Sequence, residues 1–315
     1  MADRLQHEQA QREAQRQAPH GVGIEIRGLY KLFGPNPSLH IDKARAGMSK
    51  TELNEKHGHV IGLRDINIEE VTGLGHYTLP MHVNVAPFDN VDVRIALKYA
   101  INRQDIVDKV FLGHATTGND NPIAPVVKFA IDPEPKHSYD PEKAKFHLKK
   151  AGMENLKVDL SVADAAFNGA VDAAVLYQQH AKAAGIDINV IREPNDGYWD
   201  NVWLKKSWCA SYWSGRPTAD WMFTTTYSKG AAWNETNWSH PRFEELLVQG
   251  RAETDEKKRA AIYAEMQQLQ HDDGGAIVLV FNNYVDAASK KLAHGKVAGN
   301  WEGDGLRIAE RWWFA

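Results

Sequence analysis

Cysteine is nearly absent from this sequence: Cys209 is the only one in 315 residues. A single cysteine excludes both an internal disulfide framework and a CxxC metal site. Long apolar runs are also missing, since none approaches the roughly 18–20 residues that are needed to cross a bilayer. The formal net charge is −4, which leaves no excess of basic residues for binding nucleic acid.

The motifs of common catalytic and metal sites are missing as well. Neither G-x-S-x-G nor H-E-x-x-H occurs. His57 and His59 are expected to be solvated loop histidines, and the neighbouring side chains of Asp272 and Asp273 point apart on a helix. The sequence therefore contains no acid–base constellation and predicts a non-enzymatic protein with no metal ion and no cofactor.

A phosphate-binding loop requires the pattern G-x-x-x-x-G-K-[ST] between a strand and a helix. Gly47-Met-Ser-Lys-Thr51 is superficially similar, but no glycine precedes Lys50 and no Walker B run follows. We therefore expect no nucleotide binding.

Residues 1–20 are rich in Gln, Arg and Ala and lack the apolar stretch of about 7–15 residues that a secretory signal needs. We expect a polar, disordered tail here, and a cytoplasmic location if the chain is made as written. Tryptophan is absent from the whole first part, since all ten tryptophans lie between Trp199 and Trp313. This change in composition suggests that residues 21–70 and 71–315 are distinct domains.

Residues 21–70 read as a small α/β segment. We expect a strand, a turn and a second strand over 24–33, a helix that begins with the capping box Ser49–Glu52 and ends at Gly58, and a strand over 60–69.

Residues 71–315 alternate between strand and helix patterns. The predicted strands cover 76–85, 157–162, 186–191, 276–281 and 284–288, and the predicted helices cover 94–111, 141–152, 169–184, 241–249 and 255–271. Asp140-Pro141 opens its helix well, because Asp caps free N–H groups and Pro has none at the first helical position. Such β-α-β alternation predicts an α/β fold with helices on the faces of a sheet.

Aromatic side chains crowd into residues 198–238. They either form the wall of a pocket, where large rings supply contact area with few rotatable bonds, or they pack a core. Both interpretations stay open at this point. The best pocket candidates flank loops rich in Gly, Pro and Asn, and they are Trp213, Trp221, Trp233 and Trp238, to which we add Phe167.

Three sequence blocks carry a family resemblance. Val93-Arg-Ile-Ala-Leu-Lys-Tyr-Ala-Ile-Asn-Arg-Gln-Asp-Ile-Val107, Tyr139-Asp-Pro-Glu-Lys-Ala-Lys-Phe-His-Leu-Lys-Lys-Ala-Gly152 and the unit from Arg259 to Val280 follow in order. From about residue 76 to 315, the chain thereby resembles the C-terminal half of the family 5 extracellular solute-binding proteins, the peptide, dipeptide and nickel type, of ABC importers. The resemblance implies an incomplete type II periplasmic-binding-protein lobe, with ligand held between two lobes in the family.

A second resemblance covers the N-terminal segment. The stretch from Ile24 to Pro37 and the stretch from His57 to Ile66 are similar to the start of a glycine-betaine-type ABC transporter ATPase. The Walker A loop of that family would follow residue 70, and it does not. The segment therefore implies a truncated ATPase-like start without a nucleotide site.

The loop Trp213-Ser-Gly-Arg-Pro-Thr-Ala-Asp220 departs from the family pattern. In peptide-binding relatives the matching loop reads roughly W-x-G-D, and its Asp pairs with the α-amino group of the peptide. Here Arg216 follows Gly215, and an Arg fork suits a carboxylate or phosphate. Asp220 either neutralises Arg216 within the loop or leaves it for an acidic, opine-like or sugar-phosphate-like ligand.

The resemblance implies a partial substrate-binding component of an ABC importer, which captures a small solute for a permease in the periplasm. The candidate ligand-binding residues are Phe167, Trp213, Gly215, Arg216, Asp220, Trp221, Trp233 and Trp238. Two alternatives remain: an inactive chimeric remnant of a gene fusion or deletion, and an ABC transporter ATP-binding subunit.

Overall fold

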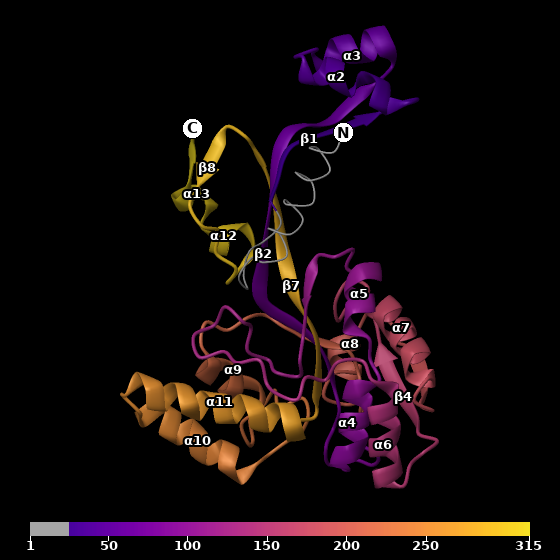
Figure 1. The fold of residues 1–315 in the computed structure, drawn as a ribbon, viewed down its shortest axis with the longest axis vertical. Coiled ribbons are helices and arrows are strands. Elements are labelled where there is room, and N and C mark those ends of the chain that lie inside the picture. Colours follow the sequence, from indigo (N-terminus) through magenta and orange to yellow (C-terminus); the bar gives the residue numbers. More distant parts are fainter. Residues whose placement is uncertain (1–24) are drawn as a thin grey trace, which may run out of the picture. The chain divides into compact units, whose positions relative to one another are not determined.

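The computed structural model describes residues 25–315 (Figure 1). The disordered tail that the sequence predicts over residues 1–20 lies outside the described residues. The chain divides into two compact units, one built from residues up to Thr72 together with Tyr284–Ala315, and the other from Gly73–Asn283.

The first unit begins with an antiparallel strand pair. Strand β1 (Glu25–Phe33) pairs with the first part of β2 (Val60–Pro80), and the 3-10 helix η1 (Pro37–His40) and helices α2 (Ile41–Arg45) and α3 (Lys50–His57) connect them. The predicted strand–turn–strand over 24–33 is wrong, because β1 is one strand whose register shifts accommodate Gly28 at φ +67°.

The predicted capping box of α3 is confirmed. Ser49 Oγ accepts from the N–H of Glu52 at 3.1 Å, and the Glu52 carboxylate accepts from the N–H of Ser49 at 3.1 Å. The helix ends at Gly58, whose φ of 65° is left-handed. Glycine adopts this conformation at little cost in free energy because it has no Cβ.

The C-terminal part of the first unit is a hairpin of β8 (Leu292–His294) and β9 (Trp312–Phe314) that encloses α12 (Glu302–Leu306) and α13 (Ile308–Arg311). Its centre is the buried carboxylate of Asp304. This carboxylate accepts from Ala298 N at 2.6 Å, Arg311 Nε at 2.8 Å and Trp312 Nε1 at 2.9 Å. These bonds lower the pKa of Asp304 against the opposing effect of burial, which is the largest single cause.

The second unit contains most of the chain. Its helices are α4 (Val91–Tyr99), α5 (Arg103–Lys109), α6 (Pro141–Ala151), α7 (Ala170–Lys182), α8 (Tyr198–Asn201), α9 (Ala219–Thr226), α10 (Pro241–Ala252) and α11 (Glu256–Asp273). Its strands are the end of β2, β3 (Ala115–Thr117), β4 (Lys157–Val162), β5 (Asp187–Arg192), β6 (Ser211–Trp213) and the start of β7 (Ala276–Ser289).

Two pairs of strands that the sequence predicts as separate are each one continuous strand in the structure. The strands predicted over 60–69 and 76–85 are one strand, β2, and the predicted pair over 276–288 is also one strand, β7. Within the second unit β6 pairs with β2, and β3 pairs with β7, both antiparallel. Local patterns show where a strand is half buried but not how far its pairing continues, so these joins were not visible in the sequence.

The helix predicted over 94–111 is wrong in its continuity. It divides into α4 and α5 because Asn102 adopts an extended conformation and its side chain accepts from the N–H of Asp105 at 3.1 Å. Asn competes with the helix for backbone groups in this way and is favoured at a helix start. The apolar periodicity continues across the break and hides it.

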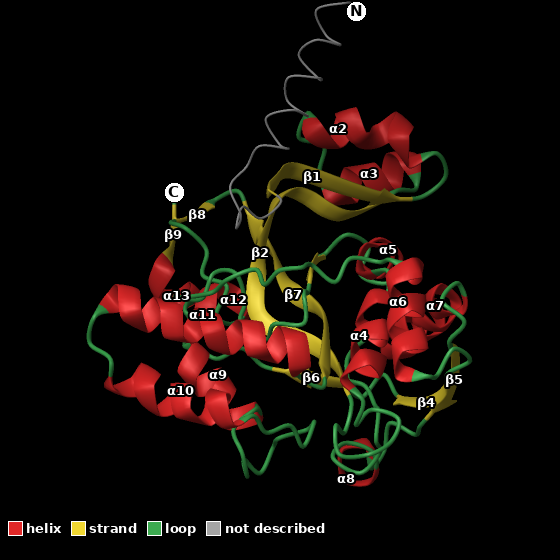
Figure 2. Ribbon diagram, turned by 60° about the horizontal axis from the view of Figure 1, so that its bottom comes forward, coloured by secondary structure: helices red, strands yellow, loops and turns green. Residues whose placement is uncertain are grey.

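The β-α-β expectation is confirmed. Strands β4 and β5 pair in parallel, joined through α7, and this layer packs with α4 and α6 around one core. A second core is formed mainly by α9, α10 and α11 with Trp213 and Trp238. Figure 2 shows these two groups of helices on opposite sides of the second unit's parts of β2 and β7.

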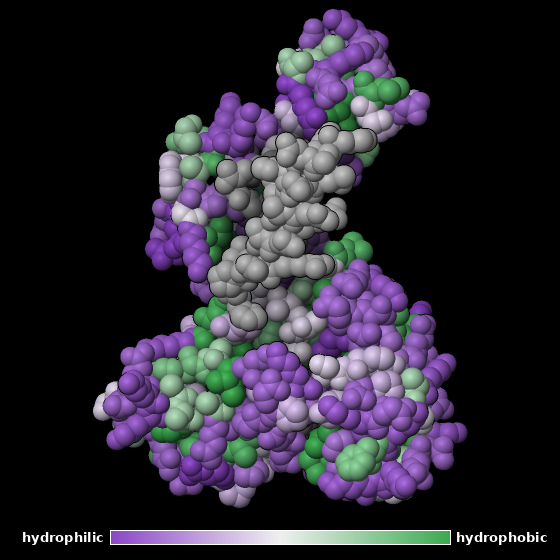
Figure 3. All heavy atoms as spheres, in the orientation of Figure 1, coloured by the Kyte–Doolittle hydropathy of each residue, from purple (hydrophilic) through white to green (hydrophobic). Residues whose placement is uncertain are grey.

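On the face drawn in Figure 3, hydrophilic side chains dominate the surface over α4 to α7, and a group of hydrophobic side chains lies over the region of α9 and α11. Within the described residues, no helix combines the length and the apolar character that spanning a membrane requires.

Candidate functional site

The centre of the aromatic region is a buried carboxylate. Glu235 is only 1% exposed, and it accepts from Trp203 Nε1 at 2.8 Å, Trp213 Nε1 at 2.9 Å and Thr78 Oγ1 at 3.1 Å. Burial raises the pKa of Glu235, and the indole hydrogen bonds oppose that shift. One carboxylate thus fixes two indole rings that precede it by 32 and 22 positions in the chain.

A chain of aromatic contacts extends from this centre to the surface. The rings of Trp203 and Trp213 lie 6.2 Å apart, those of Trp213 and Trp233 lie 6.1 Å apart, and Trp199 contacts Trp203 at 5.8 Å. Trp233 is 49% exposed, whereas Trp213 is 5% exposed. The cluster therefore has a buried base at Trp213 and an exposed edge at Trp233.

The remaining aromatic candidates lie in different environments. Trp221 is 54% exposed, but Trp238 is 2% exposed and donates from Nε1 to Asp273 Oδ2 at 2.7 Å, which fits the core-packing interpretation. Phe167 belongs to the other core, where its ring stacks on Tyr77 at 4.3 Å. The structure thus brings Trp213 and Trp233 together, while the ligand contacts of all these residues stay predictions.

The loop after β6 holds Arg216 without a carboxylate partner inside the loop. Arg216 Nη1 donates to the carbonyl of Ser214 at 2.8 Å, its guanidinium lies 5.8 Å from the centre of the Trp221 ring, and its buried Nε has no hydrogen-bond partner. Asp220 instead accepts from Arg251 Nε at 2.8 Å. Of the two alternatives for Asp220, the structure does not show the ion pair with Arg216, because Arg251 of α10 pairs with Asp220 instead.

Two residues lie where this loop meets strand β2, and we call them the floor of the site: Gly215, which belongs to the loop, and His76, which pairs with Trp213. A Cβ on Gly215 would overlap Leu74, so the close approach of these two backbone segments requires glycine. His76 is buried, and burial lowers the pKa of His76 to about 4; a hydrogen bond with the backbone of Leu74 opposes that shift, and the charge of Arg216 adds to it. The floor is therefore neutral, and Arg216 carries the positive charge.

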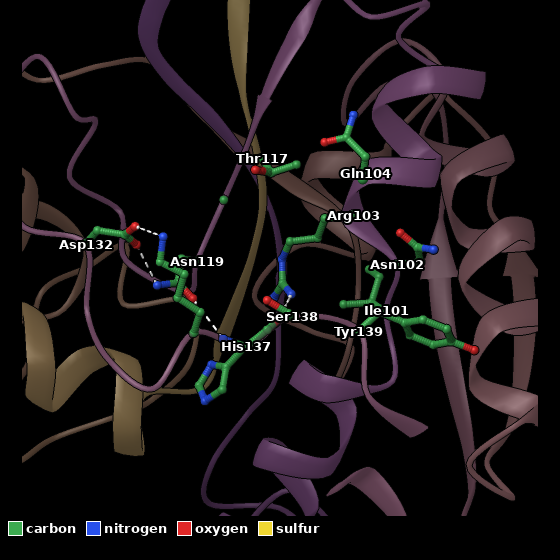
Figure 4. Close-up of a pocket in the computed structure, with 12 residues that line it drawn as sticks. Ile101, Asn102, Arg103, Gln104, Thr117, Asn119, Asp132, His137, Ser138 and Tyr139 are labelled. Carbon is green, nitrogen blue, oxygen red and sulfur yellow. Dashed lines mark hydrogen bonds and ion pairs between the residues drawn. The ribbon is translucent and has the colours of Figure 1, made fainter. Parts of the chain in front are cut away.

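A separate polar cavity of about 370 Å³ lies where α5 begins (Figure 4). Its charged groups are satisfied internally: Arg103 donates to the buried Asp120 at 2.7 Å, and Lys136 pairs with Asp132 at 2.7 Å. Figure 4 also shows Asn119 bonded to Asp132 and to the backbone of His137. None of the residues predicted from the sequence lines this cavity, and its paired charges offer little to an ionic ligand.

The sequence interpretation missed Glu235 and Thr78, and it did not single out Trp203 within the aromatic cluster. A carboxylate set between tryptophans, as in Trp233-Asn-Glu-Thr-Asn-Trp238, is a usable signal, because buried indole N–H groups need an acceptor.

No group of three or more His, Cys, Asp or Glu side chains suited to a metal ion occurs in the part of the chain that the structure describes. Cys209 is buried, and burial raises the pKa of its thiol. This thiol is therefore a poor nucleophile.

Comparison with known proteins identifies the chain's relatives. The model for "Bacterial extracellular solute-binding proteins, family 5 Middle" matches residues 45–235. The dipeptide-binding protein of Escherichia coli strain K12 is 29% identical over 244 residues, which cover 73% of this chain and 44% of that protein. The glutathione-binding protein GsiB of Pectobacterium atrosepticum is 27% identical over 228 residues, covering 69% of this chain and 44% of that protein.

Solved structures show the same fold. The ABC transporter-associated periplasmic binding protein DppA from Helicobacter pylori, in complex with the peptide STSA, matches with a TM-score of 0.66 and 24% identity, over 84% of this chain and 53% of that one. The predicted α/β periplasmic-binding-protein fold is thereby confirmed. The chain spans about half the length of the curated relatives that it matches. The family match begins at residue 45, inside the segment compared with an ATPase, and that ATPase resemblance stays a prediction.

Proposed function

Because this chain belongs to the family 5 bacterial extracellular solute-binding proteins, we propose that it contributes to solute capture for an ABC-type importer. The role is non-catalytic: the protein binds a small solute and presents it to a permease, in the periplasm. This assignment rests on the family and on a surface whose geometry suits binding.

The observation that carries the proposal is the pair of indole rings fixed by Glu235. Rigid aromatic side chains bind ligands at low entropic cost, because few rotatable bonds must be ordered. Trp203 and Trp213 are held by hydrogen bonds of 2.8 and 2.9 Å, and the exposed Trp233 lies against Trp213. We place the solute against this exposed edge.

The charge of Arg216 defines the class of solute. No carboxylate of its own loop compensates the guanidinium, its Nε lacks a partner, and it lies beside the exposed ring of Trp221. An Arg in this state favours a carboxylate or phosphate. We therefore propose a solute with a free carboxylate, a peptide C-terminus first, and opine-like or sugar-phosphate-like compounds as further members of the class.

The experiment compares Ala-Phe with its C-terminal amide, using tryptophan fluorescence to measure Kd. We expect the free acid to bind more tightly than the amide. In Arg216→Asp the preference disappears or reverses, with a loss for the acid of roughly 10–100-fold, since a hydrogen bond to a charged group contributes about 1.5–3 kcal/mol.

The matched control is Arg216→Lys, which keeps the charge but not the fork. It should retain a preference for the acid, although a weaker one. Equal binding of acid and amide by the unaltered protein, or the same selectivity in Arg216→Asp, would refute the assignment of Arg216.

A further inference from the structure

A second pocket, separate from the aromatic edge, lies between α9 and α11 and has a volume of about 260 Å³. Its lining residues are Lys128, Phe129, Thr218, Ala219, Asp220, Arg259 and Tyr263. Among the candidate residues from the sequence, Asp220 alone lines it.

Two donor groups in the lining lack an acceptor in the part of the chain that the structure describes. Tyr263 is 2% exposed, and burial raises the pKa of its hydroxyl, while a hydrogen bond from the Arg259 side chain opposes that shift; the hydroxyl proton itself has no acceptor among the described residues. The Nε of Arg259 is also buried and without a hydrogen-bond partner. Buried polar groups are nearly always satisfied, so two unsatisfied donors on one pocket point to a ligand that accepts from them.

Among the described residues, one cation around the pocket has no carboxylate partner. Asp220 is bound by Arg251 at 2.8 Å, and Lys128 is bound by Glu256 at 2.7 Å. Arg259 forms no ion pair with a carboxylate among the described residues. Both unsatisfied groups are donors, and the uncompensated charge is positive, so the fitting ligand is an anion.

The rest of the lining is apolar and flat. The rings of Phe129 and Tyr263 stack at 5.8 Å with an interplanar angle of 10°, and the guanidinium of Arg259 lies 5.8 Å from the centre of the Tyr263 ring. Ala219 adds a methyl group. At about 260 Å³ the pocket lies just below the range of roughly 300–1,000 Å³ that is usual for small-molecule sites. It therefore suits a single small ring better than a peptide.

We propose that this pocket binds a small aromatic carboxylate. The carboxylate accepts from the Tyr263 hydroxyl and from Arg259 Nε, and the ring of the ligand packs on Phe129. The site goes beyond solute capture at the aromatic edge and does not depend on it.

The test uses benzoate as the probe and saturation-transfer NMR on the full chain to measure its Kd. Benzamide has the same ring without the charge, and inorganic phosphate has charge without the ring, so both should bind at least tenfold more weakly than benzoate. Tyr263→Phe deletes only the hydroxyl, and Arg259→Gln removes the cation. Each should weaken benzoate by on the order of tenfold, which is 1.4 kcal/mol.

The controls separate this site from others. Arg242→Gln alters an exposed Arg of α10 that pairs with Glu265 at 2.7 Å, and it should leave benzoate binding unchanged. Arg216→Asp distinguishes the two proposed sites, because benzoate binding that survives this change belongs to the pocket between α9 and α11. The proposal is overturned if benzoate does not bind, if Tyr263→Phe and Arg259→Gln bind it as the unaltered protein does, or if Arg216→Asp alone weakens it.

Discussion

Replacing Glu235 with Gln tests whether one carboxylate positions the indole rings. Trp203 donates to Oε2, whereas Trp213 and Thr78 both donate to Oε1. A Gln amide has a single acceptor oxygen. It can keep the Trp213 and Thr78 bonds in one orientation, but its NH₂ group then faces the Trp203 N–H, donor against donor.

The magnitude follows from this count. One hydrogen bond to a charged acceptor is lost, which costs about 1.5–3 kcal/mol, and the relief of a buried charge offsets part of it. We expect a net destabilisation of about 2 kcal/mol, which lowers the Tm by roughly 4–8 °C for a unit of this size. Trp203 is half-buried and is the ring that should loosen, so the tryptophan emission should shift to the red.

A double-mutant cycle with Trp203→Phe decides the question. If the carboxylate and the indole act on each other, the two single changes should be non-additive by about 1 kcal/mol or more in urea unfolding. Additivity within about 0.5 kcal/mol would refute the positioning argument, because independent sites behave in that way.

The pH dependence of Glu235→Gln gives a second check. Burial raises the pKa of Glu235 in the folded state above its ordinary value of 4.5. Its contribution to stability is therefore fully present below pH 4.5 and is lost as the pH rises through the folded pKa. Gln cannot titrate, so the destabilisation by Glu235→Gln should shrink as the pH rises through this window, and a constant difference would contradict the shift.

Three further changes address the floor of the site and the first unit. Gly215→Ala should cost about 3 kcal/mol or more in urea unfolding, because its Cβ would overlap Leu74, and an unchanged midpoint would contradict that packing. His76 has a folded pKa of about 4 against an ordinary 6.5, so the free energy of unfolding falls by about 3 kcal/mol as the pH drops from 6.5 to 4. Leucine does not titrate, so His76→Leu should flatten this part of the Tm–pH curve. Ser49→Ala should cost about 1 kcal/mol and speed amide exchange in α3, whereas Ser49→Gly should cost only a few tenths.

Local signals in the sequence predicted the helix boundaries well. Asp140 caps α6 by accepting from Lys143 N at 3.0 Å, and Gly152 ends the helix at φ 69°, as the Asp-Pro start and the glycine indicated. Such features are encoded within one turn of chain. A break within an apolar pattern is harder to predict. The helix is interrupted at Asn102, between α4 and α5, but the apolar periodicity continues on both sides and hides the interruption.

The candidate site was only partly readable. The aromatic cluster stood out by composition, but the sequence did not separate Trp233 at 49% exposure from Trp238 at 2%, since exposure depends on elements far away in the chain. Asp220 pairs with Arg251, which lies 31 positions away in the sequence. Arg216 lies only four positions from Asp220 in the sequence, so the sequence alone also offered it as a partner. Long-range pairing of this kind leaves no periodic trace.

The most direct measurement of the central claim is a thermal melt of the full chain, followed by tryptophan fluorescence, with and without Ala-Phe. All ten tryptophans report on residues from 199 onward. Solute capture predicts one cooperative transition that ligand at 100 times its Kd raises by about 2.7 kcal/mol, or on the order of 5–10 °C. A transition that no carboxylate-bearing peptide, opine or sugar phosphate moves would contradict the proposed function.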